Sequence, residues 1–178
     1  MYIIMTKKRW IITILSLILI MITAASAAVI LNRLTVLPPV DKTIRSADGD
    51  LCIREEGRHI TVWQADTVIW ELDRNILAQD ILFEDVDHDG RDELMILCWK
   101  RGRYGSRRPS WVKRDELGYS QHIYIYEVAD GKIRPKWMAS DIGMKAASWE
   151  FDDGVLTITD SDGVKTQWIW ISWGLEKM

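Results

Sequence analysis

A long uncharged stretch near the N-terminus constrains this 178-residue chain more than any other feature. It runs from Trp10 to Leu31, which is 22 residues without a charged side chain. A helix of that length crosses a hydrocarbon core of about 30 Å. Three basic residues, 7–9, come directly before it, and only Arg33 follows closely. The positive-inside rule then predicts a cytoplasmic N-terminus, an exported C-terminal part, and the lipid bilayer as the partner of residues 10–31.

The same stretch also fits a cleavable signal peptide. Ala25-Ser26-Ala27 has the small-x-small form that a signal peptidase accepts, although apolar residues continue to Leu31. We expect an uncleaved signal anchor in the cell membrane, and both interpretations export the remainder. The predicted organisation is a cytoplasmic basic flank, a transmembrane helix, a stalk and an extracytoplasmic domain, at residues 1–9, 10–31, 32–46 and 47–178.

The exported part has the pattern of a β protein. No segment in it carries the 3.6-residue apolar period of an amphipathic helix. Short runs rich in Ile, Val, Trp and Tyr are separated instead by Asp-Gly turn signals. We therefore predict an all-β domain of about ten short antiparallel strands. These are residues 51–54, 59–64, 67–72, 80–84, 93–99, 121–128, 132–138, 147–151, 155–159 and 165–173.

Two halves of this domain echo each other at an offset of 61 to 67 residues. For example, residues 60–63 correspond to 123–126, and residues 93–96 correspond to 155–158. Repeats of this size predict two blade-like units, in a partial propeller or a two-sheet assembly. Two units are too few to close a propeller of ~4 to 8 blades. The domain is therefore expected to be an open assembly or to be completed by a partner chain.

An acidic motif, Asp-Val-Asp-His-Asp-Gly-Arg-Asp-Glu-Leu at residues 85–94, is the sharpest signal in the chain. Hard cations such as Ca²⁺ need several oxygen ligands, which alternate carboxylates in a tight loop supply. An EF-hand would require Glu at the twelfth position of the loop, where this chain has Ile96. The motif is thus typical of a calcium loop that precedes a strand.

This spacing resembles the calcium loops of FG-GAP and VCBS repeats, the β-propeller blades of many exported bacterial proteins. The resemblance covers the loop and its strand well, and the surrounding unit loosely. It implies one structural Ca²⁺ ion. The alternative is a solvated acidic turn, in which Asp and Gly serve the backbone. By the resemblance, the ligands would be Asp85, Asp87, Asp89, the Arg91 carbonyl and Glu93.

A basic loop, residues 100–114, separates two of the expected strands. It has seven basic and no acidic residues, so the rest of the chain carries −10 against a net charge of −3. Either its cations tie the loop to the acidic body, or they bind an anionic partner, a protein or an envelope polymer. Export argues against nucleic acid. The candidate ligand-binding residues are Arg101, Arg103, Tyr104, Arg107, Arg108, Trp111, Lys113 and Arg114.

Other chemistry is sparse in the sequence. Cys52 and Cys98 fit one disulfide or two buried free thiols. The three histidines have no metal-ligand spacing and no nucleophile motif is present, so we name no catalytic residue. We expect a membrane-tethered extracytoplasmic binding module. The alternatives are a structural subunit that completes a β assembly with a partner chain, and an envelope hydrolase.

Overall fold

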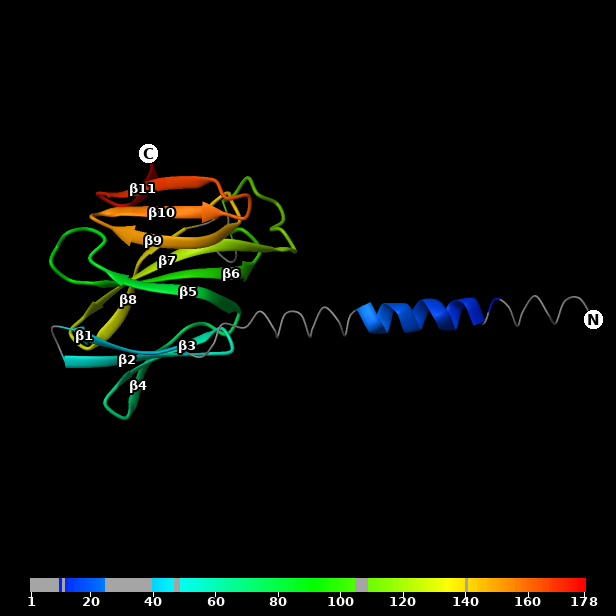
Figure 1. Cartoon of the computed structure of the whole chain (residues 1–178), viewed down its shortest axis with the longest axis horizontal. Coiled ribbons are helices and arrows are strands. Elements are labelled where there is room, and N and C mark those ends of the chain that lie inside the picture. Colours follow the sequence, from blue (N-terminus) through cyan, green and yellow to red (C-terminus); the bar gives the residue numbers. More distant parts are fainter. Residues whose placement is uncertain (1–9, 11, 25–39, 47–48, 105–108, 140) are drawn as a thin grey trace, which may run out of the picture. The chain divides into compact units, whose positions relative to one another are not determined.

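The computed structural model describes residues 10, 12–24, 40–46, 49–104, 109–139 and 141–178 (Figure 1). The chain divides into two compact units, Met1–Leu37 and Pro38–Met178, and each is described by itself. In the first unit, residues 10 and 12–24 are helical. No helix among the described residues is both long and apolar enough to cross a bilayer. Residues 11 and 25–31 of the expected span lie outside the described residues.

The second unit is all-β, as predicted. Its described residues form twelve strands in three antiparallel sheets, and in each sheet four consecutive strands are neighbours. Sheet A contains β1 (Val40–Ser46), β2 (Gly49–Glu56), β3 (His59–Gln64) and β4 (Thr67–Glu71). Sheet B contains β5 (Ile76–Glu84), β6 (Glu93–Arg101), β7 (Tyr119–Ala129) and β8 (Lys132–Met138). Sheet C contains β9 (Ala146–Asp152), β10 (Val155–Asp160), β11 (Lys165–Ile171) and β12 (Gly174–Lys177).

Three four-stranded sheets replace the two blade-like units that we expected from the sequence. The two strands that were not predicted are β1 and β12. Residues 40–46 were assigned to the stalk, but they form β1, which pairs with β2 along its whole length. Residues 32–39 of the expected stalk lie outside the described residues.

The segments that resemble each other in the two halves of the sequence lie in neighbouring sheets. Residues 60–63 and 123–126 lie on β3 and β7, the third strands of sheets A and B. Residues 93–96 and 155–158 lie on β6 and β10, the second strands of sheets B and C. Matched segments therefore occupy the same position in successive sheets.

Sheet B lies between two apolar cores, so its central strands are buried on both faces. Six consecutive residues of β6, from Glu93 to Cys98, are buried. Leu94 and Ile96 belong to the core that sheet B shares with sheet A, while Met95 and Leu97 belong to the core shared with sheet C. Alternate side chains of a strand point to opposite faces, which explains why β6 is an unbroken apolar run in the sequence.

The two outer sheets have polar outer faces. On β2, Leu51 and Ile53 are buried whereas Arg54 and Glu56 are exposed. On β11, Lys165 and Gln167 are exposed while their neighbours are partly covered. This alternation is that of strands with one face on a core and one in water. The three sheets thus form a stack whose outer faces carry polar side chains together with exposed Val68 on β4 and Ile169 on β11.

The acidic loop, residues 85–92, and the basic loop lie at opposite ends of the strands of sheet B (Figure 1). β5 begins at the basic end, because Ile76 pairs with Lys100. β1 also begins at this end. Its first residue, Val40, pairs with Glu55 beside the β2–β3 turn. This turn lies next to the start of β5, because the Arg58 carbonyl accepts a hydrogen bond from the Ala78 amide at 2.9 Å. The chain therefore enters sheet A at the end of the domain that carries the basic loop.

Candidate functional site

Three carboxylates of the acidic loop converge. Asp85, Asp87 and Asp89 each offer an oxygen, and these oxygens lie within 4.8 Å of one another. The two oxygens of Asp85 accept hydrogen bonds from the amides of Asp89 at 3.0 Å and Gly90 at 2.9 Å. Gly90 has a φ of 87°, which allows the sharp reversal that the motif predicts. The loop is thus folded around its own acidic side chains.

Lys136 on β8 is a member of this site that sequence reasoning missed. Its Nζ lies 2.5 Å from Asp87 Oδ2 and 2.8 Å from Glu93 Oε1. The other Glu93 oxygen accepts a hydrogen bond from the Val86 amide at 3.0 Å. Glu93 is therefore held by a lysine and a backbone amide, and it is not among the carboxylates that converge. Asp87 Oδ1 is buried and has no hydrogen-bond partner among the described residues.

The electrostatics of this site follow from burial and pairing. Burial raises the pKa of Glu93, while the hydrogen bonds from Lys136 and from the Val86 amide act in the opposite direction. Burial also disfavours the charged form of Lys136, but its hydrogen bonds to Asp87 and Glu93 outweigh burial and raise its pKa. The lysine therefore supplies one fixed positive charge. The three converging carboxylates, with the Arg91 carbonyl nearby in the chain, offer oxygens to one divalent cation.

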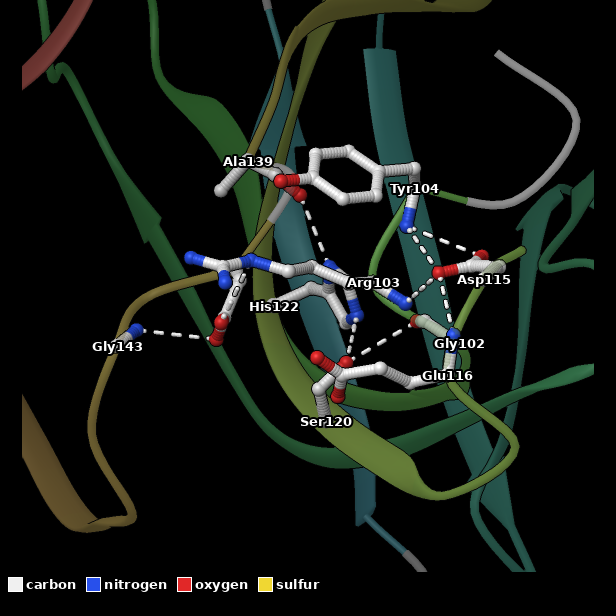
Figure 2. A network of polar contacts seen from close by, with 10 residues as sticks. Gly102, Arg103, Tyr104, Asp115, Glu116, Ser120, His122, Ala139 and Gly143 are labelled. Atoms are coloured by element: carbon white, nitrogen blue, oxygen red, sulfur yellow. Dashed lines mark hydrogen bonds and ion pairs between the residues drawn. The ribbon is translucent and has the colours of Figure 1, made fainter. Parts of the chain in front are cut away.

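Asp115 fixes the base of the basic loop, as Figure 2 shows. Its carboxylate accepts hydrogen bonds from the amides of Arg103 at 2.8 Å, Tyr104 at 3.2 Å and Glu116 at 2.9 Å. Gly102 packs against it at a φ of 79°, and a Cβ at this position would collide with the Asp115 carboxylate. The base of the loop is consequently rigid, and residue 102 must be glycine.

The structure divides the eight predicted ligand-binding residues into two groups. Arg103 belongs to the first, since its Nε lies 3.2 Å from Asp141 Oδ2, and Tyr104 is half-buried beneath its guanidinium group. Arg101 is exposed, and its Nε donates to the Leu117 carbonyl at 3.1 Å. Arg103 therefore ties the loop to Asp141 elsewhere in the domain, while Arg101 joins the two ends of the β6–β7 connection.

The second group faces solvent. Trp111 is 81 % exposed, and Lys113 and Arg114 are also exposed. Within the described part of the chain, neither of these two cations has a hydrogen bond or ion pair. Arg107 and Arg108 lie outside the described residues. The exposed group is thus accessible to a partner, and binding by it remains a prediction.

Two apolar residues beside the basic loop were not predicted. Leu117 is 80 % exposed and Tyr119 is 58 % exposed. In sequence they look like ordinary core residues, so only the structure reveals their exposure. A cavity of about 260 Å³ lies at the same end of the domain. It is lined by Asp73, Asn75, Ile76, Lys100 and Arg101.

A serine and a histidine meet beneath the basic loop (Figure 2). Ser120 Oγ lies 2.9 Å from His122 Nε2, and His122 Nδ1 lies 2.9 Å from the Ala139 carbonyl oxygen. These distances match a nucleophile, a base and an orienting group. However, His122 is fully buried, and Ser120 is also within hydrogen-bonding distance of the Gly102 carbonyl, at 3.0 Å. The contacts thus join three segments of the domain and give a buried imidazole its partners.

Cys52 and Cys98 are both free thiols. Cys98 lies in the core between sheets A and B, where burial raises its pKa to about 12. Cys52 alternates with buried Leu51 and Ile53 along β2, so its side chain is on the opposite, outer face of sheet A. Both cysteines are thus free, but of the two buried thiols that one interpretation predicted, only Cys98 is buried.

Comparison of the chain with protein-family models gave no match, and comparisons with curated proteins and with solved structures gave none either.

Proposed function

We propose that this chain is a membrane-tethered extracytoplasmic binding module, whose basic loop engages an anionic partner, a protein or an envelope polymer. The observation that carries the proposal is the exposed group formed by Trp111, Lys113 and Arg114. These side chains project from a loop whose base is held by Asp115 and Arg103. A preorganised loop base reduces the backbone entropy that is lost when a partner binds.

The tether is proposed from the sequence. It rests on the 22 uncharged residues 10–31, on the basic residues that precede them, and on the positive-inside rule. Export of the β domain follows from the same rule. Two free thiols are compatible with export here, because one of them is inaccessible in a core.

We also propose that one structural Ca²⁺ ion binds at the acidic loop, as in the FG-GAP and VCBS repeats that the motif resembles. The residues present fit a cation in part: three carboxylates converge, and Asp87 has a buried oxygen without a hydrogen-bond partner among the described residues. Glu93 does not join them, because both of its oxygens are taken, one by Lys136 and one by the Val86 amide, whereas Lys136 contacts only one oxygen of Asp87. The ion would be held by Asp85, Asp87 and Asp89, and it would cross-link the loop that precedes β6.

A structural subunit that needs a partner chain is less well supported. The outer faces of β2 and β11 carry exposed polar residues, although Ile169 on β11 is also 37 % exposed. Both apolar cores are formed within this unit.

Charge reversal in the basic loop tests the binding proposal. Full-length protein is mixed with insoluble envelope material at increasing salt, and the bound fraction is measured after sedimentation. We expect Lys113→Glu/Arg114→Glu to lower the affinity at least about tenfold at low salt, since each lost charge pair at an interface costs roughly 1 kcal/mol. Lys132→Glu/Arg134→Glu makes the same change in net charge on β8 and serves as the matched control. Equal binding of both variants would refute the assignment.

A further inference from the structure

We propose that the basic end of the β domain docks on the anionic lipid surface of the membrane that anchors the chain. This inference rests on the proposed tether, and it assigns the basic loop an anionic lipid surface in place of the protein or envelope polymer named above. The docking surface consists of the exposed residues Arg101, Trp111, Lys113, Arg114, Leu117 and Tyr119.

The side chains on this surface match the chemistry of a bilayer interface. Trp and Tyr favour the headgroup region, where an amphipathic ring has both an apolar and a polar environment. Lys and Arg are attracted to anionic headgroups, and Leu117 supplies an apolar side chain for the acyl boundary. An envelope polymer offers charge but no apolar phase. The combination of Trp111 and Leu117, 81 % and 80 % exposed, therefore favours lipid.

The chain enters the β domain at the same end as this surface. β1 begins at Val40, at the same end of the domain as the basic loop. Eight residues, 32–39, separate Val40 from Leu31, the last residue of the proposed anchor, and the nine steps along the chain span at most about 32 Å when extended. The covalent connection to the proposed anchor therefore enters the β domain at its basic end.

The charge distribution favours one orientation on such a surface. The basic loop carries seven positive charges and no negative charge, whereas the net charge of the rest of the chain is −10. The converging carboxylates Asp85, Asp87 and Asp89 lie at the opposite end of sheet B. An anionic leaflet attracts the basic end and repels the acidic end, within roughly 10 Å at moderate salt.

A fluorescent reporter at each end of the domain tests the inference in the full chain. Cys52→Ser removes the accessible thiol, and Cys98 stays unreactive in the core. Ser110→Cys then places an environment-sensitive dye on the basic loop, and Thr67→Cys places it at the other end as a control; both positions are exposed. The labelled chains are inserted into vesicles of phosphatidylcholine alone, or of equal parts phosphatidylcholine and phosphatidylglycerol. Brominated acyl chains quench a dye that reaches the bilayer.

We expect quenching at position 110 in the phosphatidylglycerol vesicles only, and none at position 67. Lys113→Glu/Arg114→Glu should lower the ratio of docked to undocked protein at least about tenfold. Inserted protein whose dye at 110 is not quenched in either vesicle overturns docking but leaves the tether intact. Failure of the chain to resist alkaline extraction from the vesicles overturns the tether and the docking together. If poly(glycerol phosphate) shields the dye at position 110 from solvent and phosphatidylglycerol vesicles do not, the partner is a polymer and the lipid assignment is wrong.

Discussion

Glu55 brings a carboxylate to the buried face of β2. The residue is 3 % exposed, and its Oε1 has no hydrogen-bond partner among the described residues. Burial raises the pKa of this carboxyl, the charge of Asp80 raises it further, and Arg58 acts in the opposite direction. The folded protein therefore keeps this proton at pH values above 4.5, the ordinary pKa of the carboxyl. The free energy of unfolding consequently falls as the pH rises from 4.5 through the raised pKa.

Replacing this carboxyl by an amide removes the buried charge. We expect Glu55→Gln to raise the free energy of unfolding by about 1 kcal/mol at pH 8 and by much less near pH 5, where the native Glu55 carboxyl is increasingly protonated. Urea unfolding at both pH values measures the difference. Glu56→Gln, at the exposed neighbouring position, is the control and should change little. An equal effect of Glu55→Gln at both pH values would contradict the buried charge.

At the scale of single elements, strands flanked by strong turn signals were predicted well. Asp130-Gly131 and Asp153-Gly154 were expected to tolerate positive φ, and all four residues have φ between 46° and 79°. β3 and β8 match their predicted bounds fully. β1 was missed because Val40–Ser46 is mostly polar and follows two prolines, so its strand structure depends on pairing with β2.

The candidate sites were predicted only as far as local sequence defines them. The convergence of Asp85, Asp87 and Asp89 follows from their spacing in one tight loop. The role of Lys136 does not, because it reaches Glu93 across 43 residues through the pairing of β6, β7 and β8. In the same way, the division of the basic loop depends on Asp115 and Asp141, whose contacts are set by tertiary structure.

The acidic loop leads to a prediction about metal. We expect excess Ca²⁺ to raise the melting temperature of the full chain over that in chelator, and Mg²⁺ to do so less, since it demands a stricter octahedral shell. At a concentration of about 100 times Kd, the gain would be about 2.7 kcal/mol. Asp87→Asn should abolish the difference, while Asp152→Asn, an exposed carboxylate at the β9–β10 turn, should not. If Ca²⁺ does not change the melting temperature of the wild-type chain, the loop is a solvated acidic turn and not a calcium site.

At the scale of the whole molecule, sheet B couples the two cores. Ile96 and Leu97 are adjacent and fully buried, yet they belong to different cores. We expect Ile96→Ala and Leu97→Ala each to cost about 2–5 kcal/mol and to leave a single unfolding transition, because neither core survives without sheet B. Calorimetry measures both quantities. Two resolved transitions in either variant would show that the outer sheets unfold independently.

At the same scale, we propose an exported, tethered domain whose basic end contacts a partner and whose opposite end faces solvent. Acetylation of lysines by a membrane-impermeant reagent, on intact cells that make the full chain, tests this most directly. Lys113 reports on the basic end, and exposed Lys132 on β8 reports on the other end. We predict strong acetylation of Lys132 and at least about fivefold weaker acetylation of Lys113, with the difference lost after the cells are opened in high salt. No labelling of either lysine on intact cells would contradict export, and equal labelling would contradict contact at the basic end.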